Sequence, residues 1–119
     1  MKYLLLIYEN EKSFASLSEA ERGEIFGEYM TYAKGIRKSG NYVGGSALQP
    51  VSDATTVRVK SGKTVTTDGP FAETREQLGG FYLVEAKDLD EAIEIAARIP
   101  DVRRGSIEVR PVMDVDMPS

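Results

Sequence analysis

The stretch DGPFAETREQ, residues 68–77, holds the densest group of side chains in this sequence that could do chemistry. The carboxylate of Asp68 could accept a hydrogen bond or a proton from a ligand. Glu73, Glu76 and Gln77 follow in the same stretch and would add polar contacts. If this turn opens into a cleft, we expect Asp68 to act as a general base or as an orienting acceptor.

Three side chains from other parts of the chain could reach the same cleft. Arg110 could hold a ligand carboxylate through two parallel hydrogen bonds. Tyr8 and Tyr82 could point their hydroxyl groups into it. Each has a structural alternative, because Arg110 could pair with an acidic neighbour or cross a subunit interface. The tyrosines could simply pack, each with one satisfied hydrogen bond.

Asp68 also has a structural alternative. Asp before Gly-Pro is common turn chemistry, since the carboxylate can accept backbone N–H groups two residues on. Pro70 suits the first position of a short helix over FAETREQL, which Asp68 or Gly69 would cap. A base poised at neutral pH would need its pKa raised by about three units, or roughly 4 kcal/mol, which burial can supply. Both roles remain open for Asp68.

The composition excludes several kinds of chemistry. The sequence has no cysteine and no histidine, so disulfides, thiolate metal sites and histidine-based proton shuttles are excluded. No Ser-His-Asp, P-loop or dinucleotide-binding pattern occurs. Asp114 and Asp116 could attract a hard cation, but two carboxylates on a fraying end make a poor cage. We therefore predict no metal and no cofactor.

Charge and hydropathy limit the partners and the location. The net charge is −4, and adjacent basic residues occur only as the two pairs Arg37-Lys38 and Arg103-Arg104, so no basic face for nucleic acid is visible. The apolar run at the N-terminus extends only from Tyr3 to Tyr8, which is too short for a signal sequence or a membrane span. We expect a soluble, cytoplasmic protein.

The elements that must position these residues follow from periodicity. The 119 residues suit one domain, here residues 1–113, with residues 114–119 expected to fray. A capping box at Ser18 and Glu21 predicts a helix over 18–39 with a stop at Gly40. Its expected apolar stripe consists of Ile25, Phe26, Tyr29, Met30, Ala33 and Ile36. A second helix should begin after Asp88 and end at Pro100. The expected strands are 2–9, 41–48, 79–86 and 106–112, with a hairpin of TTVRVK and KTVTT between the second and third.

Without the hairpin the order is βαββαβ, the ferredoxin-like arrangement, in which both helices cover one face of an antiparallel sheet. Yet KYLLLIYE and GGFYLVEA are apolar on both alternating faces, so both faces should be buried. A second copy of the chain is the simplest cover for the remaining face. We therefore predict an α+β fold, ferredoxin-like with an inserted β-hairpin, that forms a homodimeric α+β barrel.

The residues MKYLLLIYENE, the long segment TTVRVKSGKTVTTDGPFAETREQLGGFYLVEAKDLDEAIEIAARIP and GSIEVRPV together resemble the DGPF-domain proteins of the YCII-related family. The resemblance runs from Met1 to Val112 and implies a ferredoxin-like dimeric α+β barrel in a small bacterial protein. The family is largely uncharacterised. In its YCII branch a His-Asp pair has been proposed as catalytic, but this chain lacks histidine and has Ile99 at the aspartate position. That chemistry is therefore not carried over.

Three functions remain open from the sequence. The first is a small-molecule-binding protein with a cleft near Asp68. The second is a cofactor-independent enzyme that uses Asp68 as base. The third is a dimeric interaction module, since DGPF proteins are often encoded beside extracytoplasmic-function sigma factors, which implies a role in sensing or signalling.

Overall fold

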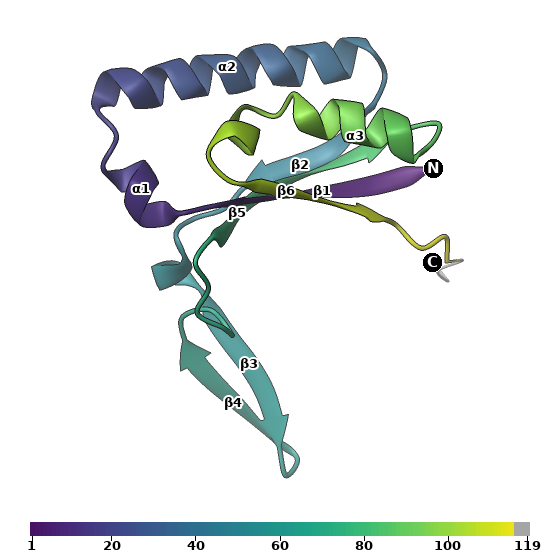
Figure 1. The fold of residues 1–119 in the computed structure, drawn as a ribbon. Coiled ribbons are helices and arrows are strands. Elements are labelled where there is room, and N and C mark those ends of the chain that lie inside the picture. Colours follow the sequence, from purple (N-terminus) through teal and green to yellow (C-terminus); the bar gives the residue numbers. More distant parts are fainter. Residues whose placement is uncertain (116–119) are drawn as a thin grey trace.

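The computed structural model describes residues 1–115 and shows the predicted α+β order (Figure 1). The strands are β1 (Lys2–Glu9), β2 (Tyr42–Ala47), β3 (Thr55–Lys60), β4 (Lys63–Asp68), β5 (Gln77–Glu85) and β6 (Ser106–Pro111). The helices are α1 (Glu11–Ala15), α2 (Glu19–Lys38) and α3 (Leu89–Ala97), with 3₁₀ turns η1 (Val51–Asp53) and η2 (Pro100–Arg103). Asp114 is exposed. Asp116 and the rest of the expected frayed tail lie outside the described residues.

Four strands form one antiparallel sheet in the order β2-β5-β1-β6, as a ferredoxin-like fold requires. Helices α2 and α3 lie on the same face of this sheet (Figure 1). The core lies between these helices and the sheet. Along β1, buried residues therefore alternate with half-exposed residues, which lie on the other face of the sheet. The buried apolar residues are Tyr3, Leu5, Ile7, Ile25, Tyr32, Ile36, Val84, Ala86, Ala92, Ile95, Ala96 and Ile99.

Helix α2 begins at the predicted residue, but the set of its side chains that are buried differs from the prediction. The Ser18 hydroxyl accepts from Glu21 N–H, and the Glu21 carboxylate accepts from Ser18 N–H, so the capping box is complete. Gly40 leaves the helix at φ 82°. The expected single apolar stripe is wrong in part, since Phe26 is 67% exposed and Met30 is 49% exposed. Tyr32, which the stripe omitted, is buried instead.

Helix α3 is capped by Asp88, whose carboxylate accepts from Glu91 N–H at 2.9 Å. It ends at Ala97, earlier than predicted, because Pro100 opens a separate turn, η2. Helix α1, η1 and η2 were not predicted from the sequence. None of the helices within residues 1–115 is long and apolar enough to cross a membrane.

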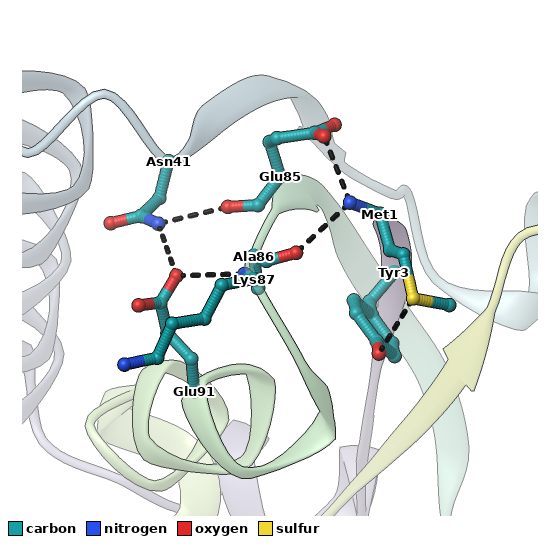
Figure 2. A network of polar contacts seen from close by, with 7 residues as sticks. All are labelled: Met1, Tyr3, Asn41, Glu85, Ala86, Lys87 and Glu91. Carbon is teal, nitrogen blue, oxygen red and sulfur yellow. Dashed lines mark hydrogen bonds and ion pairs between the residues drawn. The ribbon is translucent and has the colours of Figure 1, made fainter.

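A polar network surrounds the N-terminus of the chain at one end of the sheet (Figure 2). The N-terminal ammonium group of Met1 donates to the Glu85 carboxylate at 2.9 Å and to the Ala86 carbonyl at 3.0 Å. Asn41 donates to the Glu85 carbonyl at 2.8 Å and to the Glu91 carboxylate at 3.2 Å. The network therefore ties β1, the α2–β2 connection and the start of α3 to the end of β5.

No helix of residues 1–115 covers the second face of the sheet (Figure 1), and this face carries apolar side chains. Leu4 pairs with Leu83, and Leu6 pairs with Phe81, all four half-exposed. These residues alternate with the buried ones in β1 and so point away from α2 and α3. We call Leu4, Leu6, Phe81 and Leu83 the open face.

The hairpin β3–β4 forms as predicted and projects away from the four-stranded sheet (Figure 1). Ser61 and Gly62 take positive φ values of 50° and 75° at its tip, as a two-residue hairpin turn requires. Val57 and Val59 are 61% and 68% exposed. The hairpin thus presents apolar side chains without cover from the described part of this chain.

The short helix expected over FAETREQL does not form, and that prediction is wrong. Gly69 has φ 100°, which takes the backbone out of the helical region directly before Pro70. Its N–H donates instead to the Ala54 carbonyl at 2.7 Å, which closes the base of the hairpin. Gln77 is already paired in β5, so the segment between is an irregular connection between two strands.

Candidate functional site

A cleft of about 790 Å³ lies beneath α1 and α2, along the helix-covered face of the sheet, and its lining extends from Phe14 and Arg22 to Arg37 and Tyr42. Its walls are mostly aromatic and aliphatic, from Ile7, Phe14, Ile25, Phe26, Tyr29, Ala33, Tyr42, Ala47, Leu48 and Tyr82. Its charged lining residues are Glu9, Arg22, Arg37 and Asp101. A shallower hollow of about 520 Å³ between α2 and the α3–η2 segment lacks such a carboxylate pair. The larger cleft is therefore the candidate site.

Asp101, in η2, is a buried carboxylate in the cleft wall, with only 5% of its surface exposed. The Tyr29 hydroxyl donates to its Oδ2 at 2.9 Å, and the Arg104 guanidinium donates to its Oδ1 at 2.5 Å. Its backbone carbonyl accepts from Gly105 N–H at 2.8 Å. A buried carboxylate is stable only with such partners. The position of Asp101 is therefore fixed from α2 and from η2 itself.

Glu9 is the second carboxyl group of the cleft, and its pKa is affected by Asp101. It ends β1 in phase with Ile7, so its side chain lies on the helix-covered face. Burial raises the pKa of Glu9 to about 7, and the hydrogen bond and negative charge of Asp101 add to the rise, while Arg104 opposes it. Two close carboxyl groups cannot both ionise freely. Arg104 and Tyr29 both donate hydrogen bonds to Asp101, so the raised pKa belongs to Glu9.

Two glycines make room for this pair. A Cβ on Gly79 would lie 3.1 Å from Glu9 Oε1, so the Gly-Gly step of the DGPF segment leaves space for the carboxyl group. A Cβ on Gly105 would lie 2.0 Å from the Tyr8 carbonyl oxygen, which no side chain could tolerate. Gly105 therefore allows the chain after Asp101 to approach the end of β1 closely.

Three tyrosines, Tyr29, Tyr42 and Tyr82, line the cleft, and Tyr32, which lines the smaller hollow, packs against Tyr82. The ring of Tyr82 lies 5.3 Å from that of Tyr32 and 6.4 Å from that of Tyr42. Burial raises the pKa of Tyr29, Tyr32 and Tyr82, so all three hydroxyl groups stay neutral at physiological pH. The Tyr32 hydroxyl donates to the Ile95 carbonyl at 2.9 Å. These rings give the site a rigid, apolar side.

The two cleft arginines already have partners. Arg22 donates to the Ala15 carbonyl at 2.6 Å and lies 5.8 Å from the centre of the Phe14 ring. Arg37 lies 4.5 Å from the centre of the Tyr42 ring. Both contacts are of the cation–π kind and hold the guanidinium groups against the cleft walls.

The predicted site residues near the DGPF turn do not gather in this cleft. Asp68 ends β4 and is exposed, and Glu73 is exposed in the connection to β5. The Glu76 carboxylate accepts from the Ser106 hydroxyl at 2.9 Å. The Gln77 side chain accepts from Glu11 N–H at 3.0 Å. Glu76 and Gln77 therefore tie the ends of neighbouring elements together.

The remaining three predicted residues lie on opposite faces of the sheet. Tyr82 lines the cleft, as described above. Tyr8 and Arg110 are in phase with Leu6 and Leu4, on the open-face side. Arg110 pairs with the Glu108 carboxylate at 2.6 Å, the acidic-neighbour alternative that the sequence left open. In a single chain the seven residues thus do not form one site.

Sequence reasoning missed the carboxylate pair and its partners, Tyr29 and Arg104. One signal was present for Glu9, since a charged residue in phase with Tyr3, Leu5 and Ile7 must lie on the buried face. Asp101 gave no comparable signal, because its burial depends on the path of the chain after Pro100.

Comparison with known proteins agrees with this architecture. The family model of the YCII-related domain matches residues 1–116. An uncharacterised protein of Rhizobium meliloti (strain 1021) is 35% identical over 114 residues, which cover 94% of this chain and 92% of the relative. A match over nearly the whole length at this identity, together with the observed sheet order, shows that the chain belongs to the YCII-related family.

Proposed function

We propose that this protein is a cytoplasmic homodimer that binds a small, largely apolar molecule in the cleft beneath α1 and α2. Its polar group would contact the carboxyl groups of Glu9 and Asp101. The observation that carries the proposal is a buried carboxylate beside a carboxyl group with a pKa of about 7 in an aromatic cleft. Small-molecule sites are typically apolar clefts of about 300–1,000 Å³ with few, placed polar groups.

A purely structural role explains Asp101 better than it explains Glu9. Arg104 and Tyr29 already satisfy the Asp101 carboxylate. A second carboxyl group beside it adds desolvation and repulsion, which is why the pKa of Glu9 is raised. Unfavourable arrangements of this kind cluster at functional sites. The Glu9 position therefore favours a ligand contact over a structural one.

The cleft can be tested by filling it. Nile red, an uncharged dye that fluoresces in apolar sites, serves as the probe. Ala33 lines the cleft and Lys34 beside it is exposed, so Ala33→Trp and Lys34→Trp add the same ring inside and outside the site. We expect Ala33→Trp to weaken dye binding at least about tenfold and Lys34→Trp to leave it unchanged. Equal binding by both variants, or none by the wild type, would contradict the proposal.

The homodimer is supported by the open face. Leu4, Leu6, Phe81 and Leu83 lie half-exposed on one side of the sheet, and a second copy would remove them from water. Sedimentation velocity at micromolar concentration gives the mass directly. We expect a dimer for the wild type and a monomer for Leu83→Asp. A wild-type monomer would refute the dimer and leave the open face for a protein partner such as a sigma factor.

The alternative that Asp68 is a catalytic base or a ligand contact is tested by a pair of variants. Asp68 is exposed in the single chain, so we expect Asp68→Asn to leave both thermal stability and Nile red binding unchanged. Glu9→Gln should remove one carboxyl group from the cleft while the protein stays folded. If Asp68→Asn removes ligand binding or turnover while Glu9→Gln does not, the functional centre lies at the DGPF turn.

A further inference from the structure

We propose that the ligand of the cleft carries a protonated amine on an aromatic or aliphatic body, with the ammonium group seated against the carboxyl groups of Glu9 and Asp101. The inference rests on the proposed function, because it assumes that the cleft binds a small molecule. It adds the chemical class of that molecule.

The first argument is the charge balance around Glu9. The groups that act on it are Asp101 and Arg104 from the η2 segment and Glu11 from α1, while Tyr29 of α2 donates to Asp101. When Glu9 is ionised, this cluster contains three carboxylates, those of Glu9, Glu11 and Asp101. It contains one guanidinium group, that of Arg104. Arg104 donates to Asp101. The centre therefore carries an excess of negative charge whenever Glu9 ionises.

The second argument is that no other cation of the cleft is positioned to neutralise Glu9. Arg22 is held by the Ala15 carbonyl and the Phe14 ring, and Arg37 lies over Tyr42. Within residues 1–115, the ion pairs of the structure do not include Glu9. A cation from outside the chain would complete the site.

The third argument is the match between the walls and an organic ammonium ion. Phe14, Phe26 and Tyr29 line the same cleft as the two carboxyl groups. Aromatic faces attract organic cations, and carboxylates accept the N–H donors of an ammonium group. A carboxylate ligand would instead add a further negative charge beside two carboxyl groups. An alcohol would gain hydrogen bonds but no charge pairing.

Three probes with one body separate these cases. Phenethylamine, phenethyl alcohol and phenylpropionate share an aromatic ring and a short chain and differ in charge. We expect the amine to bind at least about tenfold more tightly than the alcohol, measured by isothermal titration calorimetry, and the acid to bind most weakly. Equal binding of all three would overturn the amine inference and leave the proposed function intact. If no probe binds and Nile red does not bind either, the proposed function fails as well.

Glu9→Gln is the test of position, and Glu24→Gln is its matched control. Both changes remove one carboxylate, but Glu24 is exposed on α2 and does not line the cleft. Glu9→Gln should abolish the preference for the amine over the alcohol while it retains binding of the alcohol. Glu24→Gln should keep the full preference. Loss of the preference in both variants would show a general charge effect and overturn the inference.

Proton release gives a readout that a structural role would not produce. With a pKa of about 7, Glu9 is half protonated near neutral pH, and an ammonium ion beside it favours the ionised form. Amine binding at pH 7 should therefore release about half a proton, as buffers of different ionisation enthalpy reveal. The release should vanish in Glu9→Gln. Tight amine binding without proton release at pH 7 would place the ammonium group elsewhere.

Discussion

Replacing Glu9 by Gln should make the protein more resistant to alkaline pH. The amide of Gln keeps hydrogen-bonding capacity at this position, but it cannot ionise. The comparison therefore isolates the charge of Glu9 while it keeps the size of the side chain.

The sign follows from the raised pKa. The folded protein holds the Glu9 proton up to about pH 7, whereas the unfolded chain releases it near 4.5. The stabilising effect of this proton is fully present below pH 4.5 and is lost as the pH rises through 7. At pH 8 the wild-type protein has therefore lost the part of its free energy of unfolding that depends on the Glu9 proton. Glu9→Gln has no such proton, so its stability does not fall for this reason.

The magnitude is limited by solvent. The whole difference in pKa corresponds to roughly 3 kcal/mol. Glu9 is only partly buried, and screening by water reduces the effect to about 1–2 kcal/mol. The amide also changes packing, and this effect on the free energy of unfolding does not depend on pH. The relevant quantity is therefore how the stability difference between the variant and the wild type changes between pH 5 and 8.

Urea unfolding at both pH values, followed by circular dichroism, measures this quantity. We expect the variant to gain about 1–2 kcal/mol over the wild type between pH 5 and pH 8. Glu24→Gln, which removes an exposed carboxylate from α2, should show no such change. A difference between Glu9→Gln and the wild type that stays constant with pH would refute the raised pKa of Glu9.

Three further changes test the supports of the site by thermal unfolding. Gly105→Ala should destabilise the fold by several kcal/mol, because its Cβ would lie 2.0 Å from a backbone oxygen; Gly27→Ala, with open space around it, should gain about 0.5–1 kcal/mol, and equal effects would contradict the close approach. Tyr29→Phe should cost about 1–3 kcal/mol, since the Asp101 carboxylate loses a donor; an unchanged melting temperature would argue against that hydrogen bond. Ser18→Ala should cost about 1 kcal/mol through loss of the capping box, and no loss would mean that the helix end is stabilised elsewhere.

The six strands and the helices α2 and α3 could be predicted from the sequence because their signals are local. Ser18 and Glu21 mark the start of α2 by spacing alone, and the alternation in KYLLLIYE identifies a strand with two apolar faces. The hairpin turn at Ser61 and Gly62 is likewise predicted by its own residues and the two short β-branched segments beside it. The short helix after Asp68 was predicted wrongly, because the positive φ of Gly69 is set by its bond to the Ala54 carbonyl, which is a distant partner in sequence.

The candidate site could not be predicted in the same way. Its key groups come from β1, α2 and η2, and only the packing of these elements brings Glu9, Tyr29 and Asp101 together. The burial that raises the pKa of Glu9 exists only in the folded chain. The charge density after Asp68 pointed to the DGPF turn instead. Part of that motif does serve the cleft, since Gly79 leaves room for the Glu9 carboxyl group.

The most direct test of the central claim is where a small molecule binds. We would titrate isotope-labelled protein with uncharged phenethyl alcohol and follow the backbone amide NMR signals, which detect weak binding and do not depend on the charge of the ligand. If the ligand binds in the cleft, we expect the largest changes in amide chemical shift at Glu9, Gly79 and Tyr82, which line it. Shifts confined to the DGPF turn around Asp68, or to Leu4 and Leu83 on the open face, would contradict the claim that the cleft is the binding site.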